Sequence, residues 1–314
     1  MTADAPAPAD LRAELGAVPV RRDVVRVSGP DAVAYLQGQL SQDVAGLAAG
    51  ATSWSFVLQP TGKVDAWVRV TRTADDEVLL DADPGTGPAL LGRLRRFLLR
   101  TKAEVEALDW PAVALRGPGA AEAAGRVLAA AGGGADAPGR PVLALPAGWP
   151  GAEGVDLLGP GAVVPEGVAE ADAAAYESLR LRSGVPALGA ELTERTIPAE
   201  AGQWVIDASV SFTKGCFTGQ ELVARIDSRG GHVPRRLHAL VAPGGEDLPV
   251  DAPVVVDGAE VGRVTSAAPA PGGGTVALAY VGRGVTAPSA AEVRTGGGDE
   301  RSVPVTVLAT PLAD

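Results

Sequence analysis

The chain has 314 residues, 46% of them hydrophobic, and a net charge of −11 at pH 7. This length and composition predict a folded protein of two or three domains and exclude a disordered chain. The negative charge argues against a nucleic-acid-binding protein that works by general attraction to phosphates. It leaves open a local basic patch for an anionic ligand.

The cysteine content and the first residues bear on the cellular setting. A single cysteine, Cys216, excludes an intramolecular disulfide and a four-cysteine metal site. No apolar run approaches the roughly 20 residues that a membrane helix needs. Residues 1–10 are rich in Ala, Pro and Asp and lack a signal-peptide pattern, so we expect a disordered lead-in. These features favour a cytoplasmic protein with neither a membrane nor a nucleic acid as its partner.

The first part of the chain predicts an α+β unit. Alternating runs predict strands at 23–28, 53–58, 64–71 and 77–81. Pro60 and Gly62 predict a hairpin loop over 59–63. Apolar spacing predicts a short helix after residue 31 and an amphipathic helix over 88–100, with these residues facing inward: Leu90, Leu91, Leu94, Phe97 and Leu98.

A short internal repeat predicts a second unit. Residues 113–120 are similar to residues 25–32, and both read as a strand, a Gly-Pro turn and an Ala-rich helix. We therefore expect two related α+β units, at about 11–110 and 111–170. A loop rich in Gly, Ala and Pro is expected at 132–141. A helix at 172–182 and a connector at 188–203 then belong to a segment, 171–232, that completes this region.

The last part of the chain predicts a separate antiparallel barrel over 233–314. No helix is expected there, and Asp257-Gly258 is typical of a hairpin turn. Short Val-rich runs alternate with Gly, Pro and Asp at 238–242, 252–256, 260–265, 275–281 and 303–308.

Cys216 lies in a segment, residues 214–221, whose neighbouring residues could make its thiol reactive. Thr218 and Glu221 have the spacing of a capping box, which predicts a helix beginning near Gly219. The helix N-terminus and Lys214 would both favour the thiolate form of Cys216. Gly215 and Gly219 leave room for a ligand or another backbone to approach. A buried, unreactive cysteine remains the alternative.

The string Lys-Gly-Cys-Phe-Thr-Gly-Gln-Glu at 214–221 resembles, at all eight positions, the signature of the YgfZ-type folate-binding proteins. Those proteins are relatives of the aminomethyltransferase (T-protein) of the glycine cleavage system, and they act in iron–sulfur cluster assembly or repair. The resemblance implies an α+β, three-domain fold around a folate-sized opening. Further segments that resemble the family, in order, are 27–32, 35–43, 60–64, 179–191, 197–198, 261–266 and 277–281.

The resemblance also implies a cofactor, tetrahydrofolate or a one-carbon derivative, and candidate contacts for it. It places Tyr176 beside the pterin, with Glu191 and Glu194 on the connector that supplies acidic contacts. Arg225, or Arg235 or Arg236, could bind the carboxylate tail. The alternatives are a core position for Tyr176 and surface positions for the charged residues. Arg22 lies at a position where the family has an aromatic residue in the wall of the pterin pocket.

Asp65 marks a departure from the transferases. Those enzymes carry an Asp-Asp pair after the Gly-containing hairpin, whereas this chain has Val-Asp-Ala-Trp at 64–67. One acid is missing, and Asp65 could point outward from a half-buried strand. His232 and His238 have no carboxylate at ligand spacing, so no metal site is expected.

The leading hypothesis is a monomeric accessory protein that binds tetrahydrofolate and supports iron–sulfur client or assembly proteins. Cys216, with Lys214 beside it, would form a mixed disulfide or give one ligand to a shared cluster, because one thiolate cannot hold a four-cysteine cluster. A folate-dependent aminomethyltransferase or demethylase is the first alternative. A folate-binding module with an inert cysteine is the second.

Overall fold

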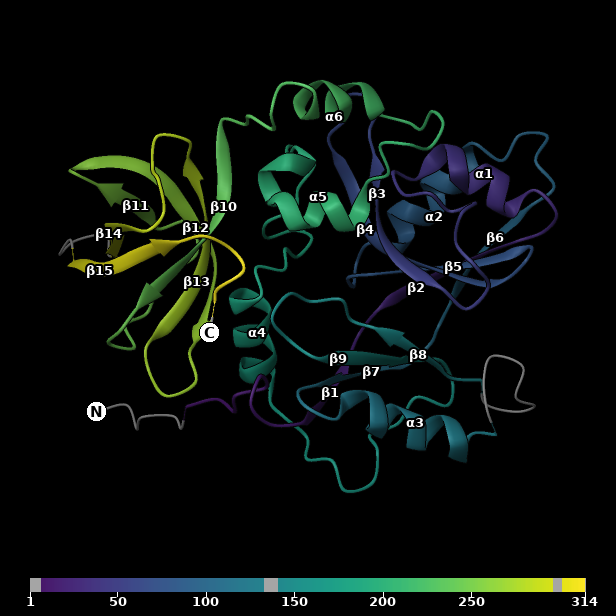
Figure 1. The fold of residues 1–314 in the computed structure, drawn as a ribbon, viewed down its shortest axis with the longest axis horizontal. Coiled ribbons are helices and arrows are strands. Elements are labelled where there is room, and N and C mark those ends of the chain that lie inside the picture. Colours follow the sequence, from purple (N-terminus) through teal and green to yellow (C-terminus); the bar gives the residue numbers. More distant parts are fainter. Residues whose placement is uncertain (1–6, 133–140, 296–300, 314) are drawn as a thin grey trace.

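The computed structural model describes residues 7–132, 141–295 and 301–313. Its strands form a five-stranded sheet, a four-stranded sheet and a closed six-stranded barrel. The barrel lies on one side of the molecule and the two sheets on the other, with α4 and α5 between them (Figure 1). This is the expected α+β architecture. None of the described helices is both long and apolar enough to cross a membrane.

The five-stranded sheet is antiparallel, in the order β3-β4-β5-β2-β6. Helices α1 (Ala32–Gln39) and α2 (Gly87–Arg96) cover one face through a buried core. The strands predicted here are confirmed. Because α2 ends at Arg96, the inward position expected for Phe97 is wrong, and 46% of that residue is exposed. The strands are β2 (Asp23–Ser28), β3 (Thr52–Leu58), β4 (Val64–Ala74), β5 (Glu77–Ala82) and β6 (Glu104–Leu108).

The four-stranded sheet recruits a strand from the start of the chain. Its order is β1-β7-β9-β8, with α3 (Ala120–Ala130) packed on it. Strand β1 precedes the first sheet in the sequence but pairs with β7, so the two units are interleaved. Most of the loop expected at 132–141 lies outside the described residues. The strands are β1 (Gly16–Val20), β7 (Ala112–Arg116), β8 (Leu143–Pro146) and β9 (Gly154–Leu158).

Residues 7–10, which the composition assigned to a disordered lead-in, contact the folded chain. Pro8 is buried, and Asp10 forms an ion pair with Arg182 at 2.7 Å. Packing therefore begins before residue 11.

The barrel closes in the order β10-β13-β12-β11-β14-β15, which confirms the predicted architecture. Asp257 and Gly258 have φ values of 50° and 80° at the predicted hairpin, a conformation that Asp-Gly pairs favour. Strand β14 was not predicted. The strands are β10 (Arg235–Ala242), β11 (Pro253–Val256), β12 (Ala259–Pro269), β13 (Thr275–Gly282), β14 (Ser289–Thr295) and β15 (Arg301–Leu308).

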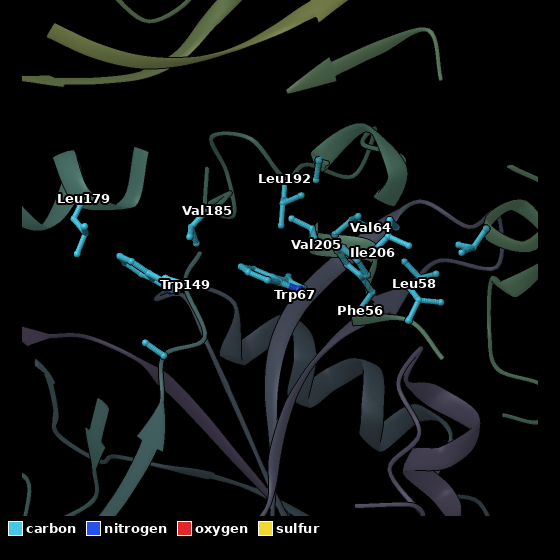
Figure 2. Packing of buried hydrophobic residues seen from close by; sticks show 14 of the residues in the cluster. Phe56, Leu58, Val64, Trp67, Trp149, Leu179, Val185, Leu192, Val205 and Ile206 are labelled. Atoms are coloured by element: carbon cyan, nitrogen blue, oxygen red, sulfur yellow. The ribbon is translucent and has the colours of Figure 1, made fainter. Parts of the chain in front are cut away.

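The segment between the sheets and the barrel is helical and covers the other face of the first sheet. Its elements are α4 (Ala173–Arg182), the 3-10 helix η1 (Pro198–Ala201), α5 (Gln203–Ser209) and α6 (Gln220–Asp227). Figure 2 shows Leu179 of α4 and Val205 of α5 in one core with Phe56, Trp67 and Trp149. Both faces of the sheet are therefore buried, and this second core borders the candidate site.

Candidate functional site

A cavity of about 70 Å³ lies where the two sheets meet the segment that follows α4. Tyr176 and Arg22, both singled out from the sequence, line it. Its other aromatic and charged lining residues are Trp54, Trp67, Asp83, Arg116, Trp149, Asp156 and Arg180. A cavity with aromatic walls and a few charged groups is the usual form of a binding site for a flat organic ligand.

The aromatic walls come from both sheets and from α4. Trp54 and Trp67 stack with ring centroids 4.1 Å apart and planes 18° apart. Trp149 and Tyr176 lie 5.2 Å apart on the other side. The indole N–H of Trp67 donates to Ser209 Oγ at 2.8 Å, and that of Trp54 to the Ala147 carbonyl at 3.3 Å. These bonds fix the two rings at the cavity wall.

Buried ion pairs join the two sheets behind these rings. Arg69 of β4 contacts Asp81 at 2.9 Å and Asp156 of β9 at 2.6 Å, and Arg116 of β7 contacts Asp156 at 2.8 Å. Arg22 extends the network to Asp81 at 2.9 Å. Burial alone would raise the pKa of Asp156, but Arg116 and Arg69 hold it well below its usual range. Asp156 is therefore ionised at neutral pH.

Two residues that line the cavity keep hydrogen-bonding capacity. Arg116 Nε is buried and has no acceptor among the described residues, while its guanidinium lies 4.4 Å from the Trp149 ring centroid. The Asp83 side chain is 31% exposed and accepts from Arg22 at 2.7 Å and from the Leu188 N–H at 3.0 Å. A carboxylate has about four acceptor positions, so Asp83 can accept further bonds. The cavity thus offers a donor, an acceptor and flat apolar walls.

Glu191, expected to contact a pterin, is fully buried and its carboxylate is saturated. It accepts from Arg180 at 3.0 Å and from the Ala187 N–H at 2.9 Å. It also accepts from the barrel hydroxyls of Thr265 at 2.7 Å and Ser266 at 2.6 Å. No lone pair remains for a ligand in this arrangement, which argues against the expected pterin contact. Glu191 instead ties the connector and α4 to the barrel.

The other predicted contacts lie on the surface. Glu194 is exposed on the connector, where its carbonyl accepts from the Gln59 side chain at 3.3 Å. Arg225 is exposed on α6. In the part of the chain that the structure describes, no hydrogen bond or ion pair joins either side chain to the cavity lining.

A β-bulge sets the direction of Asp65. The register of β3 and β4 shifts between Val57 and Leu58, so Val64 packs in the core with Trp67 while Ala66 packs in the core beneath α1 and α2. Asp65 is exposed and lies 3.6 Å from Arg93 of α2. The outward alternative is therefore the correct one, and Asp65 is not at the cavity.

The signature occupies the loop between α5 and α6, and Cys216 is exposed there. Helix α6 begins at Gln220, as predicted, but the capping box does not form. The N-cap is Gly219 with φ 81°, and the Phe217 N–H donates to Gln220 Oε1 at 3.1 Å instead. The alternative of a buried cysteine is wrong.

Lys214 points into the end of α1. Its Nζ donates to the carbonyls of Gln37 at 2.7 Å, Leu40 at 2.7 Å and Gln42 at 2.8 Å. An ammonium has three N–H donors, so none is left for Cys216. Burial lowers the pKa of Lys214 to about 8. The lysine anchors the signature loop to α1, which is a different role from the expected activation of the thiol.

The two signature glycines differ in what surrounds them. A Cβ on Gly219 would lie 2.5 Å from the Gln59 carbonyl, and one on Gly62 would lie 2.5 Å from Leu222 Cβ. The room expected at Gly219 is therefore filled by the 59–63 hairpin. A Cβ on Gly215 would have no described atom within 4 Å, so the Cys216 side of the loop is open.

Most cavity residues were not singled out from the sequence. Arg69 lies between Val68 and Val70 in β4, and Arg116 ends the otherwise apolar strand β7. A charge in a buried strand needs a partner. That signal was present, although it could not identify Asp156 or Trp149 as neighbours. Among the described residues, no group of three or more His, Cys, Asp and Glu side chains could hold a metal ion.

Comparisons with known proteins agree with this architecture. Residues 235–314 match the glycine cleavage T-protein C-terminal barrel domain. The protein named tRNA-modifying protein YgfZ of Edwardsiella ictaluri is 31% identical over 242 residues, which cover 72% of this chain and 70% of that protein. The chain belongs to the YgfZ-type family.

Aminomethyltransferases are also similar to this YgfZ-type protein over most of its length. An aminomethyltransferase of Thermus thermophilus is 31% identical over 91% of this chain and 83% of that protein. The crystal structure of the glycine cleavage system aminomethyltransferase T from Bartonella henselae has a TM-score of 0.76 at 23% identity, covering 96% of this chain and 87% of the other. The fold is therefore aminomethyltransferase-like, including the closed barrel.

Proposed function

We propose that this chain binds a tetrahydrofolate in the tryptophan-lined cavity and serves as an accessory protein in the assembly or repair of iron–sulfur clusters. Cys216 is the functional thiol in this proposal. The cavity is the single observation that carries the folate part, since it combines aromatic walls with a free buried donor and an acceptor with spare capacity. Membership of the YgfZ-type family supports both parts.

The chemistry of the cavity residues fits a pterin. Trp149 and Tyr176 supply aromatic surface, Arg116 Nε supplies a donor for a ring acceptor, and Asp83 supplies an acceptor for ring N–H groups. Glu194 is the connector acid that remains for this purpose, because Glu191 is saturated. The space of about 70 Å³ requires cavity side chains to move when a bicyclic ring enters. A bound tetrahydrofolate would supply a carrier for one-carbon groups.

Cys216 is suited to act on a partner rather than inside the protein. It is exposed, next to an open glycine, on a loop that Lys214 fixes to α1. As the only cysteine it can give one thiolate ligand to a cluster whose other ligands a partner holds. The Edwardsiella relative is named a tRNA-modifying protein, and we therefore include enzymes of tRNA modification among the candidate clients. Arg225 on α6 remains the candidate for the folate tail.

The folate part is tested by titration calorimetry with 5-formyltetrahydrofolate. We expect Trp149→Leu to weaken binding at least about tenfold, because a stacking wall is lost. Asp83→Asn should also weaken binding, since it replaces an acceptor oxygen with a donor. Trp110→Leu, outside the cavity, is the matched control. Equal affinities for Trp149→Leu and the wild type would reject this cavity as the folate site.

The thiol part is tested by complementation of a strain that lacks its own YgfZ-type protein, scored by the activity of a cluster-dependent enzyme. We expect the wild type to rescue and Cys216→Ser to fail while it still binds folate. Rescue by both would show that the thiol is dispensable. Rescue by neither, with release of formaldehyde from N-methyl substrates, would favour the one-carbon transferase instead.

A further inference from the structure

A second groove, of about 410 Å³, runs between α2 and strands β3 and β4. Its apolar lining includes Val57, Ala66 and Leu90. Its charged lining residues are Asp65, Arg93 and Arg96. A concave surface with an apolar floor and charged edges can accept an apolar side chain from a partner together with adjacent charges. The proposed folate and thiol sites do not use this groove.

The segment that contains α2 is basic although the protein is acidic. Residues 84–103 contain five cations and no acid, in a chain of net charge −11. Arg93 is paired with Asp65, and Arg95 donates to the Val105 carbonyl. Within the described ranges, no carboxylate forms an ion pair with the remaining three cations, which are Arg96, Arg100 and Lys102. This positive charge is therefore available to an anionic partner.

Two apolar side chains stand out of the same surface. Phe97 is 46% exposed and Leu99 is 88% exposed, directly after the end of α2. The Arg93 guanidinium lies 4.9 Å from the Phe97 ring centroid, which holds that ring at the edge of the groove. Exposed apolar side chains among arginines are typical of protein-binding surfaces.

We infer that this surface docks an acidic segment of a partner protein, with an apolar side chain of that segment in the groove. The cations match an acidic segment, and the apolar floor with Phe97 and Leu99 matches its apolar residues. A nucleic acid would pair its phosphates with the arginines but leave the floor uncovered. A lipid surface would receive Leu99 but not fill a groove. A polypeptide can both pair its acidic side chains with the cations and place an apolar side chain in the groove.

The groove is connected to the signature loop through the 59–63 hairpin. Arg93 donates to the Leu58 carbonyl at 3.0 Å, and the carbonyl of the next residue, Gln59, lies against Gly219. Helix α2 also packs beside α1, to which Lys214 anchors the loop (Figure 1). A partner in the groove can thus extend over the hairpin to Cys216. The inference names the kind of partner that the proposed function needs, although the docking itself requires neither folate nor a cluster.

The test is fluorescence anisotropy of the full chain with a labelled synthetic peptide that carries Glu residues on both sides of a Leu-Phe pair. We expect Arg96→Glu/Arg100→Glu to weaken binding at least about tenfold. A peptide with Ala in place of Leu-Phe should also bind more weakly than the parent peptide. Arg294→Glu, an exposed arginine on the barrel, is the matched control and should bind like the wild type.

Equal affinity of the Arg96→Glu/Arg100→Glu variant and the wild type would overturn the inference. Tighter binding of oligouridylate RNA or of phosphatidylglycerol vesicles than of the peptide would overturn it as well. Trp149→Leu and Cys216→Ser should bind the peptide like the wild type. A failure of the folate or thiol proposal is therefore distinguishable from a failure of this one.

Discussion

Lys214 is half-buried, with its ammonium enclosed by three main-chain carbonyls at the end of α1. Carbonyls at a helix C-terminus carry partial negative charge and lack intrahelical donors, so a cation is a favourable partner for them. Desolvation opposes this attraction and lowers the pKa of the lysine to about 8. The residue therefore fixes the signature loop, at the cost of a partly desolvated charge.

The pKa of Lys214 predicts a pH dependence of stability. Between pH 8 and its ordinary value of 10.5, the unfolded chain keeps a proton that the folded chain has released. The free energy of unfolding should therefore rise with pH in this window. We expect this rise to be smaller in Lys214→Met, measured by urea unfolding at several pH values. Lys102→Met is the control, and parallel curves for Lys214→Met and the wild type would contradict the assignment.

At the scale of elements, the signature is held by the contact between α6 and the β3–β4 hairpin. Gly219 has φ 81°, a conformation that disfavours any residue with a side chain, and it lies against the Gln59 carbonyl. Gly62, with φ 80°, meets Leu222 from the other side. Gly62 and Gly219 therefore allow the backbones of the β3–β4 hairpin and of α6 to approach each other. This close approach explains why both positions are glycine.

This crossing predicts different effects for the two signature glycines. Gly219→Ala should lower the free energy of unfolding by about 1–3 kcal/mol, because the methyl group meets a carbonyl and the backbone is strained. Gly215→Ala has open space and serves as the matched control. Urea unfolding of both variants measures the difference. A Gly219→Ala variant as stable as Gly215→Ala would show that the hairpin contact is not tight.

At the scale of the whole molecule, Glu191 connects the cavity to the barrel. Its carboxylate holds the barrel hydroxyls of Thr265 and Ser266 as well as Arg180 and the Ala187 N–H, and the last two belong to residues that line the cavity. The position of the barrel relative to the connector and the shape of the cavity therefore both depend on the carboxylate of Glu191. The interleaved strand β1 joins the two sheets in a similar way.

Glu191→Leu should destabilise the protein by about 1–3 kcal/mol, because it removes one of the two carboxylates that pair with the buried Arg180 and leaves the Ser266 hydroxyl without its acceptor. We expect hydrogen exchange to rise in β12 and in residues 185–188 together. Glu122→Gln, an exposed acid on α3, is the control. A rise confined to β12 would show that the cavity does not depend on the barrel.

The local features of the fold were predictable because they depend on neighbouring residues. Alternating apolar positions predicted the strand 23–28, and Asp257-Gly258 predicted its hairpin, since side-chain direction and turn conformation are set within a few residues. Strand β1 was missed because its partner, β7, lies far along the chain. Pairing of distant strands leaves no local pattern.

The amino-acid pattern alone predicted the first α+β unit and the C-terminal barrel, and the YgfZ-type signature around Cys216 implied the family and its fold. Only the tertiary structure decided what the charged residues do. Lys214 reaches carbonyls more than 170 positions away, and Glu191 reaches hydroxyls more than 70 positions away. Trp54, Trp149 and Tyr176 come together from three separate elements or loops. Partners of buried polar groups are chosen by spatial packing, and sequence spacing therefore cannot specify them.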